Sequence, residues 1–359
     1  MSRRRKRMPS IGVAIALLSG TAYGVVQASD QDPLDAVRRS TSPDAAVMDT
    51  WIDEQITALG ASTAPDRFRV FTTAFRRQRL DSRNTTAFVR MFTSRTARAA
   101  ERVFAKPEVD ATTAQAVARV LRDMNRVERV PGVVAGLGSN VPEVRYLCAA
   151  ALADQVEEIA SGRPEERRTV ITALQTTGLS ETNAVVLSHV YRALAYPTHV
   201  AEVLPAHLAI FDKRLAARRS GSGVVQCAEL SAFEFFRDVA GGLNAAEQKA
   251  LVARLAVFLR LDVERYGTRF GPTVMAFSER DCIERRVDAV EATLAGLTGK
   301  PRPIEASELL GAAVLRDEAG ARQQRAALLA SLHAWIGDVG KSKPGVLNDA
   351  RWGVPVGAP

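Results

Sequence analysis

Apolar residues recur at helical spacing along nearly the whole chain from Asp44 onward. Phe68, Phe71 and Phe75 fall at positions i, i+3 and i+7, which places them on one helix face. We find no run of alternating β-branched residues between turn signals that predicts a strand. Prolines and glycines fall between the periodic segments, where they start and end helices. We therefore predict an all-α protein of about twelve helices, in which short connections make neighbouring helices antiparallel.

One stretch of sequence recurs along the chain. The segment 136–153, GLGSNVPEVRYLCAAALA, joins a loop to a helix that starts at Pro142 and ends in a run of small residues. Similar segments begin at Glu181, at Val224 and, in a more degenerate form, at Glu279. Counted from Glu143, the first two follow at intervals of 38 and 43 residues. Self-similarity at such a period predicts an array of stacked units.

This pattern resembles the HEAT-like, armadillo-type family of α-helical repeats, over about residues 110–299. The resemblance implies an α-solenoid of stacked antiparallel helix pairs, which presents a long curved surface without a catalytic pocket. The alternative is an irregular α-helical domain whose amphipathic helices happen to recur. Both interpretations give an all-α fold.

The sequence predicts further segments on both sides of the repeat array. We expect a signal peptide over 1–28, Arg-rich helices over 29–109, the repeat array over 110–299, a capping helix within 300–337 and a flexible tail over 338–359. The segment Ala245–Tyr266 predicts one helix that is long for a repeat unit, and Trp335 is expected to pack the cap against the last repeat.

The first residues have the pattern of a secretory signal peptide. Five positive charges over residues 3–7 precede the apolar run 11–18, and Val26 and Ala28 suit the −3 and −1 positions of a cleavage site after Ala28. The alternative is an uncleaved anchor, although its glycines and polar residues suit lipid poorly. Cleavage would leave 43 basic and 40 acidic residues, so most of the net charge of +8 belongs to the signal. We expect a periplasmic or secreted protein.

Basic charge is concentrated in one part of the expected mature chain. Between Asp66 and Lys106, ten arginines and Lys106 stand against three acidic residues. Such an asymmetry attracts an anionic partner. The candidate anion-contact residues are Arg76, Arg77, Arg79, Arg83 and Arg90. The alternative is a solvated helix surface that is partly paired with acids elsewhere in the chain.

Three cysteines cannot all pair within one chain. Cys148, Cys227 and Cys282 each lie on a predicted helix among small or apolar neighbours. We favour buried cysteines that act as small hydrophobic residues, with one disulfide plus one thiol as the alternative.

The sequence contains no motif that predicts catalysis, a cofactor or a metal site. HExxH, GxSxG and CxxC are absent, and the four histidines have no partner at metal-ligand spacing. We expect no cofactor and no nucleic-acid partner. We favour a non-enzymatic scaffold that binds a protein or an anionic envelope component, and that meets a membrane only as a peripheral surface or through an uncleaved anchor. The enzyme alternative is an α/α-toroid polysaccharide hydrolase or lyase, which needs paired carboxylates.

Overall fold

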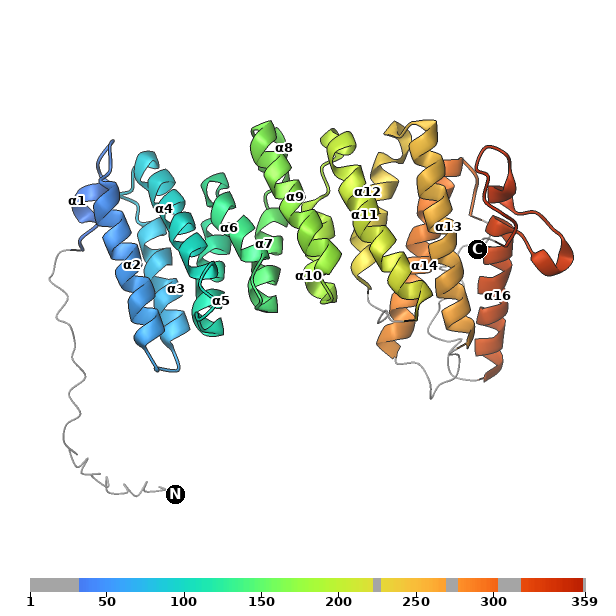
Figure 1. The fold of residues 1–359 in the computed structure, drawn as a ribbon, viewed down its shortest axis with the longest axis horizontal. Coiled ribbons are helices and arrows are strands. Elements are labelled where there is room, and N and C mark those ends of the chain that lie inside the picture. The colour runs from blue at the N-terminus through green and yellow to red at the C-terminus, as the bar shows by residue number, and fades with distance from the viewer. Residues whose placement is uncertain (1–31, 222–226, 269–276, 303–317, 358–359) are drawn as a thin grey trace, which may run out of the picture.

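The protein is an elongated array of helices with its two ends far apart (Figure 1). The structure is a computed structural model that describes residues 32–221, 227–268, 277–302 and 318–357. These residues contain fifteen α-helices and no strand, with one isolated antiparallel bridge between Asp338 and Lys343. The expected signal peptide over 1–28 lies outside the described residues.

The helices form two layers, because each one contacts the helix that lies one repeat further along the chain. The first layer comprises α2 (Ala45–Ala61), α4 (Thr86–Phe104), α6 (Val130–Leu137), α9 (Pro164–Ser180), α11 (Val200–Arg219), α13 (Ala245–Thr268) and α16 (Glu318–Ile336). The second layer comprises α3 (Arg67–Leu80), α5 (Ala111–Met124), α7 (Pro142–Ala153), α10 (Ala184–Ala193), α12 (Leu230–Val239) and α14 (Phe277–Thr298). The all-α solenoid of stacked helix pairs is confirmed. Helices α2 to α5 continue both layers, so the N-terminal Arg-rich helices stack as part of the same array.

The recurring segments of the sequence all lie in the second layer, as helices α7, α10, α12 and α14. Their small residues allow close packing: Ala149 and Ala150 of α7 are fully buried where α7 lies between its neighbours. The sequence repeat therefore marks one layer of the solenoid.

Side-chain caps and prolines set where these helices begin. Asp44 accepts from the backbone N–H of Ala46 before α2, and Asn183 accepts from that of Val185 before α10. Helices α7 and α9 begin at prolines, whose missing N–H costs nothing in the first turn. Asn125 ends α5 in the left-handed conformation, with a φ of 44°.

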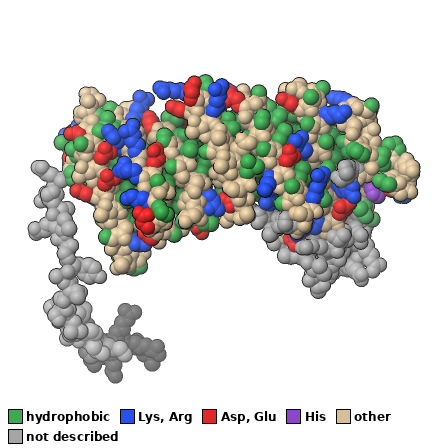
Figure 2. All heavy atoms as spheres, in the orientation of Figure 1, with side chains coloured by type: hydrophobic (Ala, Val, Ile, Leu, Met, Phe, Trp, Pro, Cys, Tyr) green, Lys and Arg blue, Asp and Glu red, His purple; other side chains and the backbone are tan. Residues whose placement is uncertain are grey.

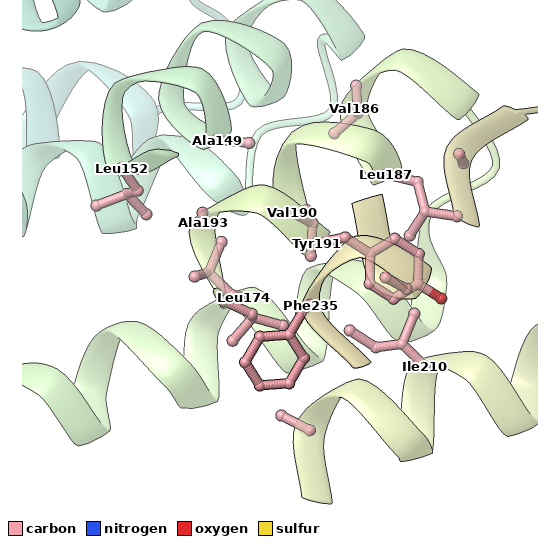
Figure 3. Close-up of a cluster of buried hydrophobic side chains, with 14 of the residues drawn as sticks. Ala149, Leu152, Leu174, Val186, Leu187, Val190, Tyr191, Ala193, Ile210 and Phe235 are labelled. Atoms are coloured by element: carbon pink, nitrogen blue, oxygen red, sulfur yellow. The ribbon is translucent and has the colours of Figure 1, made fainter. Parts of the chain in front are cut away.

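The hydrophobic core lies between the two layers. Figure 3 shows its central part, where Leu174 of α9 and Ile210 of α11 meet Val190 and Tyr191 of α10 and Phe235 of α12. All five side chains are buried. Because each helix faces partners from the preceding and following repeats, the core continues along the array without a break.

The fifteen helices exceed the expected number of about twelve. Three short ones account for the difference: α1 (Asp35–Arg38), α6 and α8 (Val156–Ser161). The long α13 follows the expected helix, and Trp335 of α16 is fully buried, with its indole N–H donating to Glu291 of α14 at 3.3 Å.

Residues 338–357, which the sequence suggested as a flexible tail, fold back against the last helices of the array. Leu347 and Trp352 are buried, because the short 3-10 helix Val346–Asn348 packs against α16. Arg260 of α13 donates to the carbonyl of Gly357 at 2.8 Å. Apolar side chains far apart in an irregular segment give no periodic signal, so the sequence pattern does not predict that they are buried.

The cysteines also differ from the favoured interpretation. Cys227 and Cys282 form a disulfide, with their Cα atoms 5.3 Å apart. Cys148 is the buried thiol, and burial raises its pKa to about 12, which leaves it unreactive. The pairing depends on helices 55 residues apart in sequence, which cysteine spacing alone does not predict.

Candidate functional site

Helix α3 supplies three arginines that have no carboxylate partner. It contains five arginines and no acidic residue, and its apolar face packs into the core through Phe71 and Phe75. Arg76 and Arg77 are exposed and Arg79 is half-buried. Within the described ranges, no ion pair involves any of the three. Their charges are therefore available to a partner.

Helix α5 extends this basic surface. Arg76 and Arg79 line a shallow depression together with Val120 and Asp123 of α5. Asp123 pairs with the exposed Arg119 one turn earlier, at 3.1 Å.

Arg122 connects α5 to the next two repeats. Its guanidinium lies 5.8 Å from the ring centroid of Tyr146 on α7, and its Nε is 3.5 Å from Asp154. The Tyr146 ring meets the edge of His189 on α10, with centroids 5.1 Å apart. Arg192 lies one turn beyond His189 and is exposed. An unbroken set of contacts thus crosses three helices of the second layer.

His189 is the titratable centre of this surface. Burial lowers its pKa, and the positive charges of Arg192 and Arg122 lower it further. The imidazole is therefore neutral at pH 7, and its Nδ1 has no hydrogen-bond partner among the described residues. That nitrogen is itself buried, so it is not available to a ligand bound on the surface.

We call this surface the basic row. Its members are Arg76, Arg77, Arg79, Arg119, Arg122, Tyr146, His189 and Arg192, from α3, α5, α7 and α10. Sequence analysis found the three α3 arginines and missed the others. Tyr146 and His189 are 43 residues apart, one repeat interval, and that spacing was the signal that could have placed them side by side.

The other two candidate anion contacts are neutralised by nearby acids. Arg83 pairs with Asp81 at 2.7 Å and with Asp35 at 3.0 Å. Its side-chain hydrogen bond holds the pKa of Asp81 well below the usual range. Arg90 lies on the first layer, 3.5 Å from Glu128. Neither residue belongs to the basic row.

Much of the Arg-rich segment forms ordinary surface ion pairs. These are Arg67 with Asp110, Arg69 with Asp66, Arg95 with Asp49 and Arg102 with Asp53. Figure 2 shows the result on one face, where basic and acidic side chains alternate over the N-terminal helices. These arginines therefore fit the alternative interpretation, a solvated helix surface that is paired with acids elsewhere in the chain.

Three buried carboxylates of the described residues, Glu229, Asp262 and Glu291, are not placed to act as the acid pair of a glycoside hydrolase. Glu229 and Asp262 are buried, and each pairs with arginines. Burial alone would raise the pKa of Glu229, but Arg218 and neighbouring arginines lower it below its ordinary value. Burial raises the pKa of Glu291 to about 7, but its side chain is fully enclosed. None of these three carboxylates can serve as a general acid for a bound substrate.

The array is also open. Helices α2 and α16 lie at opposite ends of the molecule (Figure 1), so the helices do not close into the toroid that the enzyme alternative requires. Over the described part of the chain, no group of three or more histidine, cysteine or acidic side chains is arranged to hold a metal ion. Among the same residues, no helix is long and apolar enough to span a membrane.

No family model matches the chain, and no curated protein matches it. Among solved structures, the array is similar to yeast importin-beta (Kap95p), with a TM-score of 0.42 and 13% sequence identity. The similarity covers 83% of this chain and 40% of that protein, so the chain spans well under half the length of its structural neighbour. The assignment of the fold as a solenoid depends on the contacts within the two layers described above, and not on this similarity.

Proposed function

We propose that this protein is an exported, non-enzymatic helical-repeat binding protein that holds an extended anionic partner along the basic row. The partner is an acidic stretch of a protein or an anionic envelope polymer. The single observation behind the proposal is that arginines, an aromatic ring and a half-buried histidine follow one another across four consecutive repeats of one layer, with the arginines at its two ends, on α3 and α10, unpaired within the described ranges.

The dimensions of the row suit an extended ligand. Packed helices lie roughly 10 Å apart, so α3, α5, α7 and α10 together span roughly 30 Å. That length corresponds to about nine residues of extended chain. Arg76, Arg77, Arg79 and Arg192 have no acid partner in the described ranges, so a bound anion would replace water rather than an existing ion pair.

Two features support export. The residues before Ser29 have the charge and hydrophobicity pattern of a cleavable signal peptide. The disulfide between Cys227 and Cys282 is of a kind that persists in oxidising compartments such as the periplasm. Mass spectrometry of the mature protein should find Ser29 as the first residue, and an intact N-terminus would contradict cleavage.

Binding is tested with a fluorescein-labelled ten-residue glutamate peptide, measured by fluorescence polarisation at low and high salt. We expect saturable binding that weakens with salt. The triple variant Arg76→Ala, Arg79→Ala and Arg122→Ala should weaken it by about tenfold, since each surface ion contributes modestly.

The matched control removes three arginines that lie outside the row and have acid partners, by Arg69→Ala, Arg95→Ala and Arg102→Ala. These changes remove the same number of positive charges as the triple variant, so the control should bind nearly as the unmodified protein does if the row is the binding surface. Equal losses in the triple variant and the control would show a diffuse charge effect and overturn the basic row. A pull-down from envelope extract with the triple variant and the control then distinguishes the two partner classes, an acidic protein and an anionic polymer.

A further inference from the structure

The disulfide between Cys227 and Cys282 joins two neighbouring parts of the second layer. Cys227 begins the 3-10 helix Cys227–Glu229, which leads directly into α12, and Cys282 lies in the second turn of α14. Helices α12 and α14 also contact each other directly. The bond therefore links two consecutive repeats in the C-terminal half of the array (Figure 1).

The two cysteines of this bond differ in their surroundings. Cys282 is 3% exposed, whereas Cys227 is half-buried. The guanidinium of Arg286, one turn further along α14, is fully buried, and its Nη1 lies 3.4 Å from the Sγ of Cys282. A neighbouring arginine stabilises a cysteine thiolate. Cys227 is therefore the more accessible cysteine, and Cys282 is the one whose thiolate the protein is arranged to stabilise.

A chain of buried ion pairs also connects the segments that carry the two cysteines. Glu229, at the end of the 3-10 helix that Cys227 begins, pairs with Arg218 of α11 at 3.2 Å. Arg218 and Arg286 share the carboxylate of Asp262 on α13, at 2.8 and 2.7 Å. The guanidinium beside Cys282 is thus the last member of an ionic chain that starts next to Cys227.

Helices α12 and α14 have further contacts that do not depend on the disulfide. The hydroxyl of Thr293 on α14 donates to the carbonyl of Phe233 on α12 at 3.3 Å. Phe233 and, on α14, Val290 and Leu294 are buried in the core. Because the ion pairs and the apolar packing remain when the sulfur atoms separate, we expect the reduced protein to stay folded.

We propose that this disulfide is a site of thiol–disulfide exchange, at which a dithiol reductant attacks Cys227 and Cys282 is the leaving group. A thiolate of the reductant forms a bond to the Sγ of Cys227, and the bond between the two cysteines breaks. Its electron pair stays on Cys282, as a thiolate beside Arg286.

The second thiol of the reductant completes the exchange. It loses its proton to solvent and attacks the reductant's own sulfur in the mixed disulfide, so that Cys227 leaves as a thiolate and takes up a proton. The reductant becomes a cyclic disulfide, and the protein gains two electrons.

Reduction changes how firmly the two repeats are joined. The covalent link is lost, and the thiolate of Cys282 offers Arg286 a second anionic acceptor in competition with Asp262, which weakens the ionic chain. Helices α12 and α14 then separate more easily. The redox state of the compartment thus controls the stiffness of the C-terminal half of the array. None of these residues belongs to the basic row, so the exchange is independent of an anionic partner.

Treatment with glutathione tests which sulfur is attacked, because this monothiol forms a mixed disulfide in its first step. The folded protein is treated with glutathione, quenched with acid and alkylated with N-ethylmaleimide, and its peptides are analysed by mass spectrometry. We expect glutathione on Cys227 and the maleimide on Cys282. Cys148 is the internal control and should carry no glutathione, since it is in no disulfide. Glutathione on Cys282 instead, or no adduct until urea unfolds the protein, would overturn the proposal.

The contribution of Arg286 is measured by the rate of reduction with dithiothreitol in Arg286→Gln. The matched control is Arg218→Gln, because both changes remove an ion pair with Asp262 and Arg286 is the one that lies beside Cys282. Arg286→Gln should slow reduction by about threefold or more, since a leaving thiol of higher pKa departs more slowly, and the control should not slow it. Equal rates in two folded variants would contradict the assigned leaving group. If either variant unfolds, the position of the glutathione adduct in the unmodified protein decides.

Hydrogen exchange of the unmodified protein tests the effect on the array. After reduction the circular dichroism spectrum should remain helical, while amide exchange in α12 and α14 becomes faster than in the oxidised protein. Oxidised glutathione should restore the bond and the slower exchange. Loss of the helical spectrum on reduction, or unchanged exchange in both helices, would overturn the redox control of stiffness.

Discussion

Arginine has opposite roles on the surface of helix α3 and in the interior between α11, α13 and α14. Arg76 and Arg77 of α3 are exposed and unpaired within the described ranges. Arg286 of α14 is fully buried, donates to Asp262 of α13 at 2.7 and 2.8 Å, and shares that carboxylate with Arg218 of α11. Both regions are arginine-rich, but Asp262 receives the charges of Arg286 and Arg218, whereas no described acid pairs with Arg76 or Arg77.

This difference shows what each arginine contributes. A buried arginine must be compensated, because leaving its charge without a partner in the core costs several kcal/mol. In this network the compensation joins α11, α13 and α14 and links two consecutive repeats. An exposed arginine without a partner adds little to stability, and its charge is available for binding.

The largest expected effect comes from Asp262→Ala, which removes the acceptor shared by Arg218 and Arg286. Breaking a buried ion pair by removing one partner costs about 3–5 kcal/mol. The matched control is Asp53→Ala, which removes the exposed partner of Arg102 and should cost less than about 1 kcal/mol. Urea denaturation followed by circular dichroism measures both. Similar losses would show that the two regions do not differ as described.

The next effect comes from replacing the disulfide by Cys227→Ser with Cys282→Ser. The bond closes a chain segment of 55 residues in the same C-terminal region, so its loss should cost about 2–4 kcal/mol. Dithiothreitol should lower the unfolding midpoint of the unmodified protein and leave that of the double variant unchanged. Cys148 serves as the internal control, because it has no disulfide to lose. An unmodified protein that is insensitive to reductant would contradict the pairing.

A smaller, pH-dependent effect should follow from Glu291→Gln. Glu291 accepts hydrogen bonds from Ser331 and Trp335 of α16, and burial raises its pKa from 4.5 to about 7. Since the folded state holds the proton more tightly, this stabilisation is complete below pH 4.5 and is lost as the pH rises through 7. The glutamine variant should therefore match the unmodified protein near pH 4.5 and exceed its stability by about 1–3 kcal/mol at pH 8. A difference in stability that is the same at both pH values would contradict the assignment.

The smallest effect on stability is expected on α3. Replacing Arg76, Arg77 and Arg79 by alanine should change the free energy of unfolding by less than about 0.5 kcal/mol per residue, because surface substitutions away from specific contacts are nearly neutral. The same variant should lose affinity for the glutamate peptide. A large loss of stability would mean that these arginines serve the fold, as Arg286 does.

The sequence predicted the helices and their stacking correctly, because both depend on local patterns. The helical spacing of Phe68, Phe71 and Phe75 predicts one buried face on α3. Phe71 and Phe75 of this face are buried in the core. The small residues of the recurring segments identified the second layer. The three arginines of the basic row on α3 followed from charge counting alone.

Only the tertiary structure decided which distant residues meet. The pairing of Cys227 with Cys282, the contact of Arg260 with Gly357 and the contact of Tyr146 with His189 all join helices or segments that are far apart in sequence. The rotation of each helix about its axis and its position in the packed array set these contacts. Helical periodicity shows that a face is buried, and only the packed array determines which side chains lie opposite it.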